Sequence, residues 1–142
     1  MFSKEESKQI RQDFWIFFGK RYPRKWLLYD TKVKEINLKF SFDNQKSQVS
    51  FDIETHDELI REYYFEKFES LKNLLKAEIS EEIILEQDYL RSSGKIISRI
   101  YLEKTGVNIH NKTHWPEVFD FFNENMQKFE LFWYEYQDFI TS

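Results

Sequence analysis

The chain has 142 residues, a formal net charge of −4 and no cysteine. A net-acidic chain has no global positive field to attract nucleic acid, so such binding would need a local basic patch. The absence of cysteine excludes disulfides, thiol catalysis and cysteine-ligated zinc. No segment approaches 18 uninterrupted apolar residues, and no signal-peptide pattern opens the chain. We therefore expect a cytoplasmic protein that does not associate with membranes.

Aromatic residues are unusually frequent, with 15 Phe, 8 Tyr and 4 Trp, whereas the chain has only three Gly and two Pro. This composition is not that of a disordered or low-complexity segment. It favours long regular elements around an aromatic core, and no linker-like stretch interrupts them. We expect residues 1–142 to form a single domain.

The first predicted element is a helix that starts at a capping box, Ser3-x-x-Glu6. Gly19 and Pro23 are expected to end it. Its apolar face is predicted to contain Ile10, Phe14, Phe17 and Phe18.

Two strands follow, over residues 35–42 and 48–54, because apolar and polar residues alternate strictly in both. The intervening "DNQKS" predicts a turn and hence an antiparallel hairpin. One face of the hairpin is predicted to carry Ile36, Leu38, Phe40, Phe42, Val49, Phe51 and Ile53. The first strand presents Glu35, Asn37, Lys39 and Ser41 on the other face.

A second capping box, Thr55-x-x-Glu58, predicts a helix that runs to about residue 79. Its apolar arc is predicted to consist of Ile60, Tyr63, Tyr64, Leu71, Leu74 and Leu75. A second hairpin is expected over residues 82–90 and 95–104, with Gly94 supplying a positive φ in the turn "RSSG".

The last predicted element is a long helix over residues 113–140, with Thr113 as its cap and Pro116 in its first turn. The resulting order is α-ββ-α-ββ-α. We predict an α+β fold in which a four-stranded antiparallel sheet of two hairpins packs against helices on one face.

The last helix is apolar over roughly 160°, more than the 100° or so that a surface helix needs. A core stripe is predicted at Trp115, Phe119, Phe122, Met126, Phe129, Trp133, Tyr136 and Ile140, and Phe121, Phe132 and Phe139 lie beside it. These three residues have two interpretations. Either the helix is wedged between the sheet and a neighbouring helix, or they form a homodimer or partner interface.

The sequence contains no recognisable catalytic or metal-binding motif. His110 and His114 have the i, i+4 spacing of zinc ligands, but no cysteine or suitably spaced carboxylate completes a set. Asp52-x-Glu54 and Glu86-x-Asp88 pair acids as metal-dependent nucleases do, yet neither pair has the lysine that such sites use. We therefore expect no catalytic residues, no metal and no cofactor, and keep a metal-dependent nuclease as an alternative.

The segment "GKRYPRKW" concentrates positive charge where the first helix ends. One interpretation is a phosphate contact in which an aromatic ring stacks on a base. The other is a helix C-terminus whose dipole favours cations. The first interpretation predicts a nucleic-acid site, extended by the second hairpin, that consists of Lys20, Arg21, Arg24, Lys25, Trp26, Arg91, Lys95 and Arg99.

Three segments, "INLKFSFDNQKSQVSFDIE", "YFEKFESLKNLL" and "NKTHWPEVFDFFNENMQKFE", are similar to an uncharacterised prokaryotic family of domains of unknown function. Members of about this length often follow restriction-endonuclease-like domains, which implies a role near DNA or in defence. The resemblance carries no known site residues. We expect a non-catalytic module that binds nucleic acid or a nuclease-type protein, with a metal-dependent nuclease or a purely structural homodimer as alternatives.

Overall fold

The computed structural model describes residues 1–142 and contains one four-stranded sheet with helices against it. The elements in chain order are α1 (Lys4–Arg21), β1 (Ile36–Phe42), β2 (Lys46–Ile53), α2 (Glu58–Ser70), α3 (Lys72–Glu78), β3 (Ile84–Leu90), β4 (Ile96–Thr105), a 3₁₀ turn (Lys112–His114) and α4 (Trp115–Ile140). The predicted α+β fold with two hairpins is therefore confirmed.

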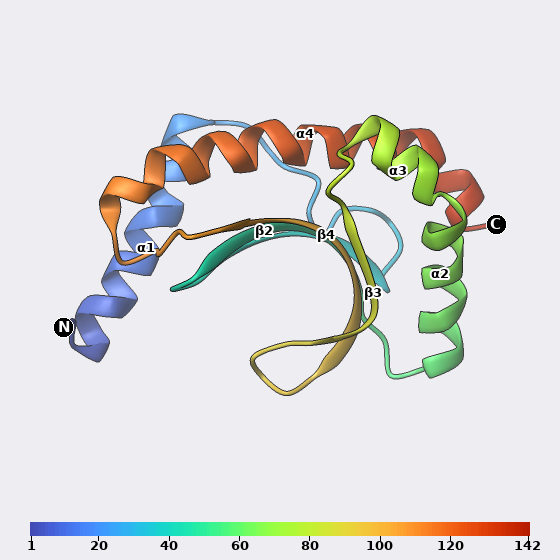
Figure 1. Ribbon diagram of the computed structural model, residues 1–142, viewed down its shortest axis with the longest axis horizontal. Coiled ribbons are helices and arrows are strands. Elements are labelled where there is room, and N and C mark those ends of the chain that lie inside the picture. The colour runs from blue at the N-terminus through green and yellow to red at the C-terminus, as the bar shows by residue number, and fades with distance from the viewer.

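The sheet has the strand order β1-β2-β4-β3, and all neighbouring strands are antiparallel. Two hairpins are thus joined through their second strands, which leaves β1 and β3 as the edges. Figure 1 shows the sheet as an arch with the helices along its convex side. The turn between β3 and β4 curls beneath the concave side, which no helix covers.

The core lies between the convex side of the sheet and the helices. The predicted inward-facing residues of β2 are fully buried, and those of β1 are buried or packed against the core. From the helices, Phe14, Phe68, Phe122, Phe129 and Trp133 fill the space above them. Aromatic rings meet mainly edge to face or tilted, the arrangements that their quadrupoles favour.

The capping box of α1 forms as predicted. The Ser3 hydroxyl accepts a hydrogen bond from the Glu6 amide at 3.1 Å, and the Glu6 carboxylate accepts one from the Ser3 amide at 3.1 Å. The helix nevertheless continues through Gly19 to Arg21. A glycine inside a helix costs only about 1 kcal/mol, whereas Pro23 disfavours helical geometry in the residue before it.

The second helix differs from its prediction in both its start and its buried face. Asp57 is the cap, because its carboxylate accepts hydrogen bonds from the amides of Leu59 and Ile60 at 3.0 and 3.3 Å. The element also breaks at Leu71 into α2 and α3. The predicted arc was wrong in part, since Ile60, Tyr63 and Leu74 are exposed whereas Arg61, Phe65 and Phe68 are buried.

The last helix begins at Trp115 after a 3₁₀ turn that Asn111 caps, so Thr113 is not the cap. The predicted core stripe is confirmed, with Phe119 and Tyr136 half-buried at its margins. Phe132 is only 1% exposed and packs on Phe51 and Tyr136, which removes it from the proposed interface. Phe121 is half-buried, and Phe139 is exposed beneath the ammonium group of Lys67. None of the helices is both long and apolar enough to cross a lipid bilayer.

The cap assignment gives a direct stability prediction. Asp57→Ala leaves two amides of the first turn of α2 without their acceptor and is expected to lower the free energy of unfolding by about 1 kcal/mol. Thr55→Ala, the matched control, removes only a contact to the Asp57 amide and should cost less. Urea unfolding measures both, and a larger cost for Thr55→Ala would restore the capping box at Thr55.

Candidate functional site

The concave side of the sheet contains buried polar side chains although no helix lies on it (Figure 1). Gln48, Ser50 and Asp52 from β2 and Arg99 from β4 are each less than 5% exposed. The alternation of both strands places these residues on the face opposite the aromatic core. They form a polar floor rather than a solvated surface.

An ion pair between Asp52 and Arg99 joins β2 to β4 at the centre of this floor. Arg99 donates two hydrogen bonds to the two carboxylate oxygens of Asp52, each 2.8 Å long, and a third to the Gln48 carbonyl at 2.7 Å. The ring of Tyr89 lies 4.4 Å from the guanidinium carbon. Burial alone would lower the pKa of Arg99, but the hydrogen bonds and charge of Asp52 outweigh it and raise that pKa.

The neighbouring tyrosine is also held in a fixed protonation state. Tyr101 is 5% exposed and donates its hydroxyl hydrogen to Glu86 on β3. Burial raises the pKa of Tyr101 most, and the negative charges of Glu86 and Glu103 raise it further. The phenol therefore remains a neutral hydrogen-bond donor at any physiological pH.

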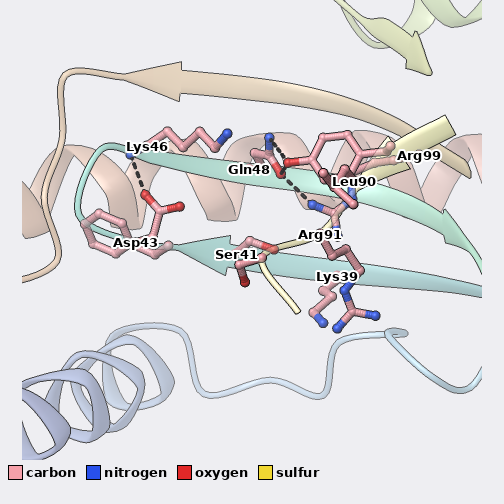
Figure 2. A pocket seen from close by; sticks show the side chains of 11 residues that line it. Lys39, Ser41, Asp43, Lys46, Gln48, Leu90, Arg91 and Arg99 are labelled. Atoms are coloured by element: carbon pink, nitrogen blue, oxygen red, sulfur yellow. Dashed lines mark hydrogen bonds between the residues drawn. The ribbon is translucent and has the colours of Figure 1, made fainter. Parts of the chain in front are cut away.

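Above the floor lie two adjoining hollows that share Lys39 and Arg91. The first, of about 420 Å³, extends over the polar floor between the β1–β2 turn and the curled β3–β4 turn. The second, of about 480 Å³, continues past the start of β1 and is lined by Tyr29, Lys34 and Lys95 among others. Figure 2 shows Lys39 and Arg91 extending toward the same side of the sheet. We call the two hollows together the concave groove.

Cations outnumber acids in the concave groove. Six are present, namely Lys34, Lys39, Lys46, Arg91, Lys95 and Arg99, against the two acids Asp43 and Glu54 in the lining. Three more acids lie on the same face and bring the total to five: Asp52 and Glu103 pair with Arg99 and Lys46, and Glu86 accepts from Tyr101. The groove is therefore locally positive in a chain whose net charge is −4.

Glu54 neutralises only part of this charge. It accepts hydrogen bonds from Arg91 at 2.9 Å and from Lys95 at 2.6 Å. The hydrogen bond from Lys95 holds the pKa of Glu54 below its ordinary value against the opposing effect of partial burial, and Arg91 and Lys39 act in the same direction. Lys34 and Lys39 have no carboxylate within 4 Å, so they are the cations available to an anionic ligand.

The structure separates the predicted nucleic-acid residues into two groups. Arg91, Lys95 and Arg99 meet in the concave groove. Residues 20–26 line neither of its hollows and lie where α1 ends. The single basic patch expected from the sequence therefore does not form.

Two residues of the second group, Arg24 and Trp26, have a structural role. Arg24 donates to both carboxylate oxygens of the buried Glu130 at 2.8 and 3.0 Å, and Glu130 also accepts from the Leu27 amide at 2.7 Å. The Arg24 guanidinium also lies 3.9 Å from the ring centre of Trp26, which packs on Phe18 and Phe40. This segment thus fastens the chain after α1 to α4. Lys25 pairs with Asp30 at 3.4 Å, whereas Lys20 and Arg21 are exposed.

The four carboxylates considered for a nuclease each contact a different cation or phenol. Asp52 binds Arg99, Glu54 binds Arg91 and Lys95, Glu86 accepts from Tyr101, and Asp88 binds Arg61 on α2. No group of three or more His, Asp or Glu side chains converges as metal ligands would. His110 and His114, which have the spacing of zinc ligands, form hydrogen bonds instead. His110 bonds to the Ser7 hydroxyl, and His114 accepts from the Asn108 amide.

Sequence reasoning missed Tyr29, Lys34, Lys39 and Lys46 as members of one site. The alternation of residues 35–42 placed Lys39 on the polar face of its strand, which is the one signal that pointed to the groove. Nothing local indicates that the coil after α1 brings Tyr29 and Lys34 to the same place.

The buried ion pair predicts a large cost for removing one partner. Asp52→Asn leaves Arg99 buried without a counter-charge and should lower the free energy of unfolding by about 3–5 kcal/mol. Glu54→Gln, whose cationic partners are partly exposed, should cost less than about 1 kcal/mol. Denaturant unfolding of both variants measures the difference, and equal costs would mean that the pair is not desolvated.

A double variant distinguishes the cost of leaving one charge unpaired from the cost of removing both charges. Asp52→Leu combined with Arg99→Met removes both charges and should be more stable than Asp52→Leu alone, because no unpaired charge stays buried. The reverse order would show that Arg99 contributes mainly by packing.

Comparison with known proteins identifies a family but no activity. No curated protein matches the chain, and no solved structure matches it. The family model described as "Domain of unknown function (DUF4268)" matches residues 10–137, which span α1 through nearly all of α4. The sheet and its concave groove fall within that range, as do the helices except for the first residues of α1 and the last residues of α4. The chain therefore belongs to this family of domains of unknown function.

Proposed function

We propose that this domain binds single-stranded nucleic acid along the concave groove, without catalysis. The observation that carries the proposal is Lys39, which lines both hollows and has no acidic partner. Lys34, which lines the second hollow, also has no acidic partner. Phosphate groups spaced along a strand are the ligands that such a row of cations would neutralise.

An exposed aromatic ring favours single-stranded over double-stranded nucleic acid as the ligand of the groove. Tyr29 is 69% exposed although it lines the same hollow as Lys34 and Lys39. A ring in that position offers a face on which an unpaired base stacks, while the lysines contact the flanking phosphates. The bases of a duplex already stack on each other and leave this ring without a partner.

The cations of the groove that form ion pairs differ in whether they can still donate hydrogen bonds to a ligand. Arg91 and Lys95 share one carboxylate, Glu54, so each retains hydrogen-bond donors for a phosphate. Arg99 is less than 5% exposed and uses each of its three nitrogens in a hydrogen bond to Asp52 or Gln48, so it stabilises the floor instead. An association with nuclease-type proteins, which the family resemblance implies, agrees with a nucleic-acid ligand and stays an expectation.

Fluorescence anisotropy with labelled single strands and duplexes of DNA and RNA, at two salt concentrations, tests the proposal. The double variant Lys34→Gln/Lys39→Gln should bind single strands more weakly, with a salt slope smaller by about 1.4, since each lost phosphate contact contributes roughly 0.7. The matched control is Lys20→Gln/Arg21→Gln, which removes two exposed cations outside the groove. Equal weakening by both variants, or no binding at low salt, would contradict the proposal.

A second variant is expected to bind single strands more tightly rather than more weakly, which gives an independent test. Glu54→Gln releases Arg91 and Lys95 from their shared carboxylate and should tighten binding to single strands. The same titration measures it against Glu117→Gln, which removes an exposed acid on α4 whose one ion pair is with Lys104. Unchanged affinity in Glu54→Gln would place the ligand outside the concave groove.

A further inference from the structure

The outer edge of β1 has unpaired backbone groups. Two hairpin hydrogen bonds, from the Asp43 amide to the Lys46 carbonyl and from the Glu54 amide to the Glu35 carbonyl, show that odd-numbered residues of this strand face β2. The even-numbered residues therefore face away from the sheet. The Leu38 amide accordingly bonds outward, to the Leu28 carbonyl at 3.0 Å.

The chain after α1 covers only the first half of this edge. The Ile36 amide bonds to the Val33 carbonyl, and the Ile36 carbonyl accepts from the Thr31 hydroxyl. Beyond Leu38 the cover ends. The amide and carbonyl groups of Phe40 and Phe42 point outward and have no hydrogen-bond partner in the protein. This stretch, which we call the open edge, runs from Leu38 to Phe42 and measures about 14 Å at 3.4 Å per residue.

The other edge of the sheet is protected in a way that the open edge is not. The register of β3 shifts between Glu86 and Tyr89, and Arg61 of α2 donates to the Gln87 carbonyl within that irregularity. Bulges and polar or charged residues are the devices that keep edge strands from pairing with other chains. The register of β1 is regular throughout.

An apolar hollow opens beside the open edge. It has a volume of about 230 Å³, and its walls are formed by Trp15 of α1, Leu28, and Leu38 and Phe40 of β1, among others. Trp15 is 38% exposed there although its ring stacks on Phe122. An apolar side chain of an added strand would enter this hollow while its backbone pairs with Phe40.

The charges at the two ends of the open edge indicate what the added strand would carry. Lys39 lines the apolar hollow, and Arg11 lines a second hollow of about 440 Å³ next to Phe42. Asp43 also lines this second hollow, but its carboxylate already accepts hydrogen bonds from the amides of Gln45 and Lys46. Neither cation has an ion pair, and Arg11 donates only to the Ser7 hydroxyl. A second copy of this chain would bring the same two cations to the edge and repel. An acidic segment would be attracted instead.

We propose that the open edge of β1 binds an extended peptide of a partner protein, which adds to the sheet as a fifth strand. The peptide places an apolar side chain between Trp15 and Phe40, and acidic residues on either side of it meet Lys39 and Arg11. Its backbone bonds the free groups of Phe40 and Phe42. This site lies at the edge of the sheet beside the concave groove, and the two share Lys39. The backbone groups of Phe40 and Phe42 and the apolar hollow at Trp15 belong to the edge site alone.

The free protein already provides one test, because hydrogen exchange followed by NMR reads single amides. The amides of Lys39 and Ser41 face β2 and should be protected, whereas those of Phe40 and Phe42 should exchange at least about 10-fold faster. Protection of Phe40 and Phe42 that increases with protein concentration would mean that a second copy occupies the edge, and would overturn the proposal.

The ligand test uses a phage-displayed library of random decapeptides as the probe. Enriched peptides should share one apolar residue flanked by acidic residues, and the synthetic peptide should protect the amides of Phe40 and Phe42. Methylation of the peptide nitrogens that face β1 should abolish binding, because the backbone bonds are lost. No enrichment, or binding without protection of these two amides, would overturn the proposal.

Matched substitutions on α1 complete the test. Trp15→Gln removes a wall of the hollow and should weaken the selected peptide about 10-fold, or about 1.4 kcal/mol. Phe17→Gln is the control, because Phe17 is similarly exposed on the same helix but does not line the hollow. Thermal unfolding checks that both variants are folded. Lys34→Gln should leave peptide binding unchanged, which separates this result from failure of the nucleic-acid proposal.

Discussion

The ion pair between Asp52 and Arg99 allows the sheet to leave its concave side without helices. Both side chains are almost fully buried, so each would be costly alone, and the two hydrogen bonds between them satisfy both charges. Gln48 accepts a third hydrogen bond from Arg99, and the ring of Tyr89 lies against its guanidinium group. Because the floor is internally satisfied, the cations above it are left free to meet a ligand. The same pair also fixes the register of β2 against β4.

A second ion pair, in which the carboxylate is buried and the arginine is exposed, connects elements on the convex side. Glu130 of α4 binds Arg24 and the Leu27 amide, which draws the chain after α1 against α4. The same coil then continues to Tyr29 and Lys34 in the concave groove and to the cover over the first half of β1. The basic segment that attracted attention in the sequence therefore positions the groove without lining it, and both proposed binding regions depend on where this coil ends.

The fold was predictable from the sequence because its signals are periodic. The alternation of β1 and β2 and the wide apolar stripe of α4 each follow from one local pattern. The start of α2 could not be predicted in the same way. Thr55 and Asp57 both carry oxygens that can cap a helix, and only the backbone geometry selects Asp57. The site was harder. Arg24 and Lys39 are both cations beside aromatic residues, and only the tertiary position of Glu130 distinguishes the neutralised one from the free one.

Lysine acetylation measured by mass spectrometry tests the central claim most directly, because it reports on every lysine of the unmodified protein at once. With saturating single-stranded oligonucleotide, the account predicts slower acetylation of Lys34 and Lys39 and unchanged rates at Lys20 and Lys25, which lie outside the concave groove. Slower acetylation at Lys20 and Lys25 with no change at Lys34 and Lys39 would contradict it. In that case the end of α1, rather than the open face of the sheet, would be the binding surface.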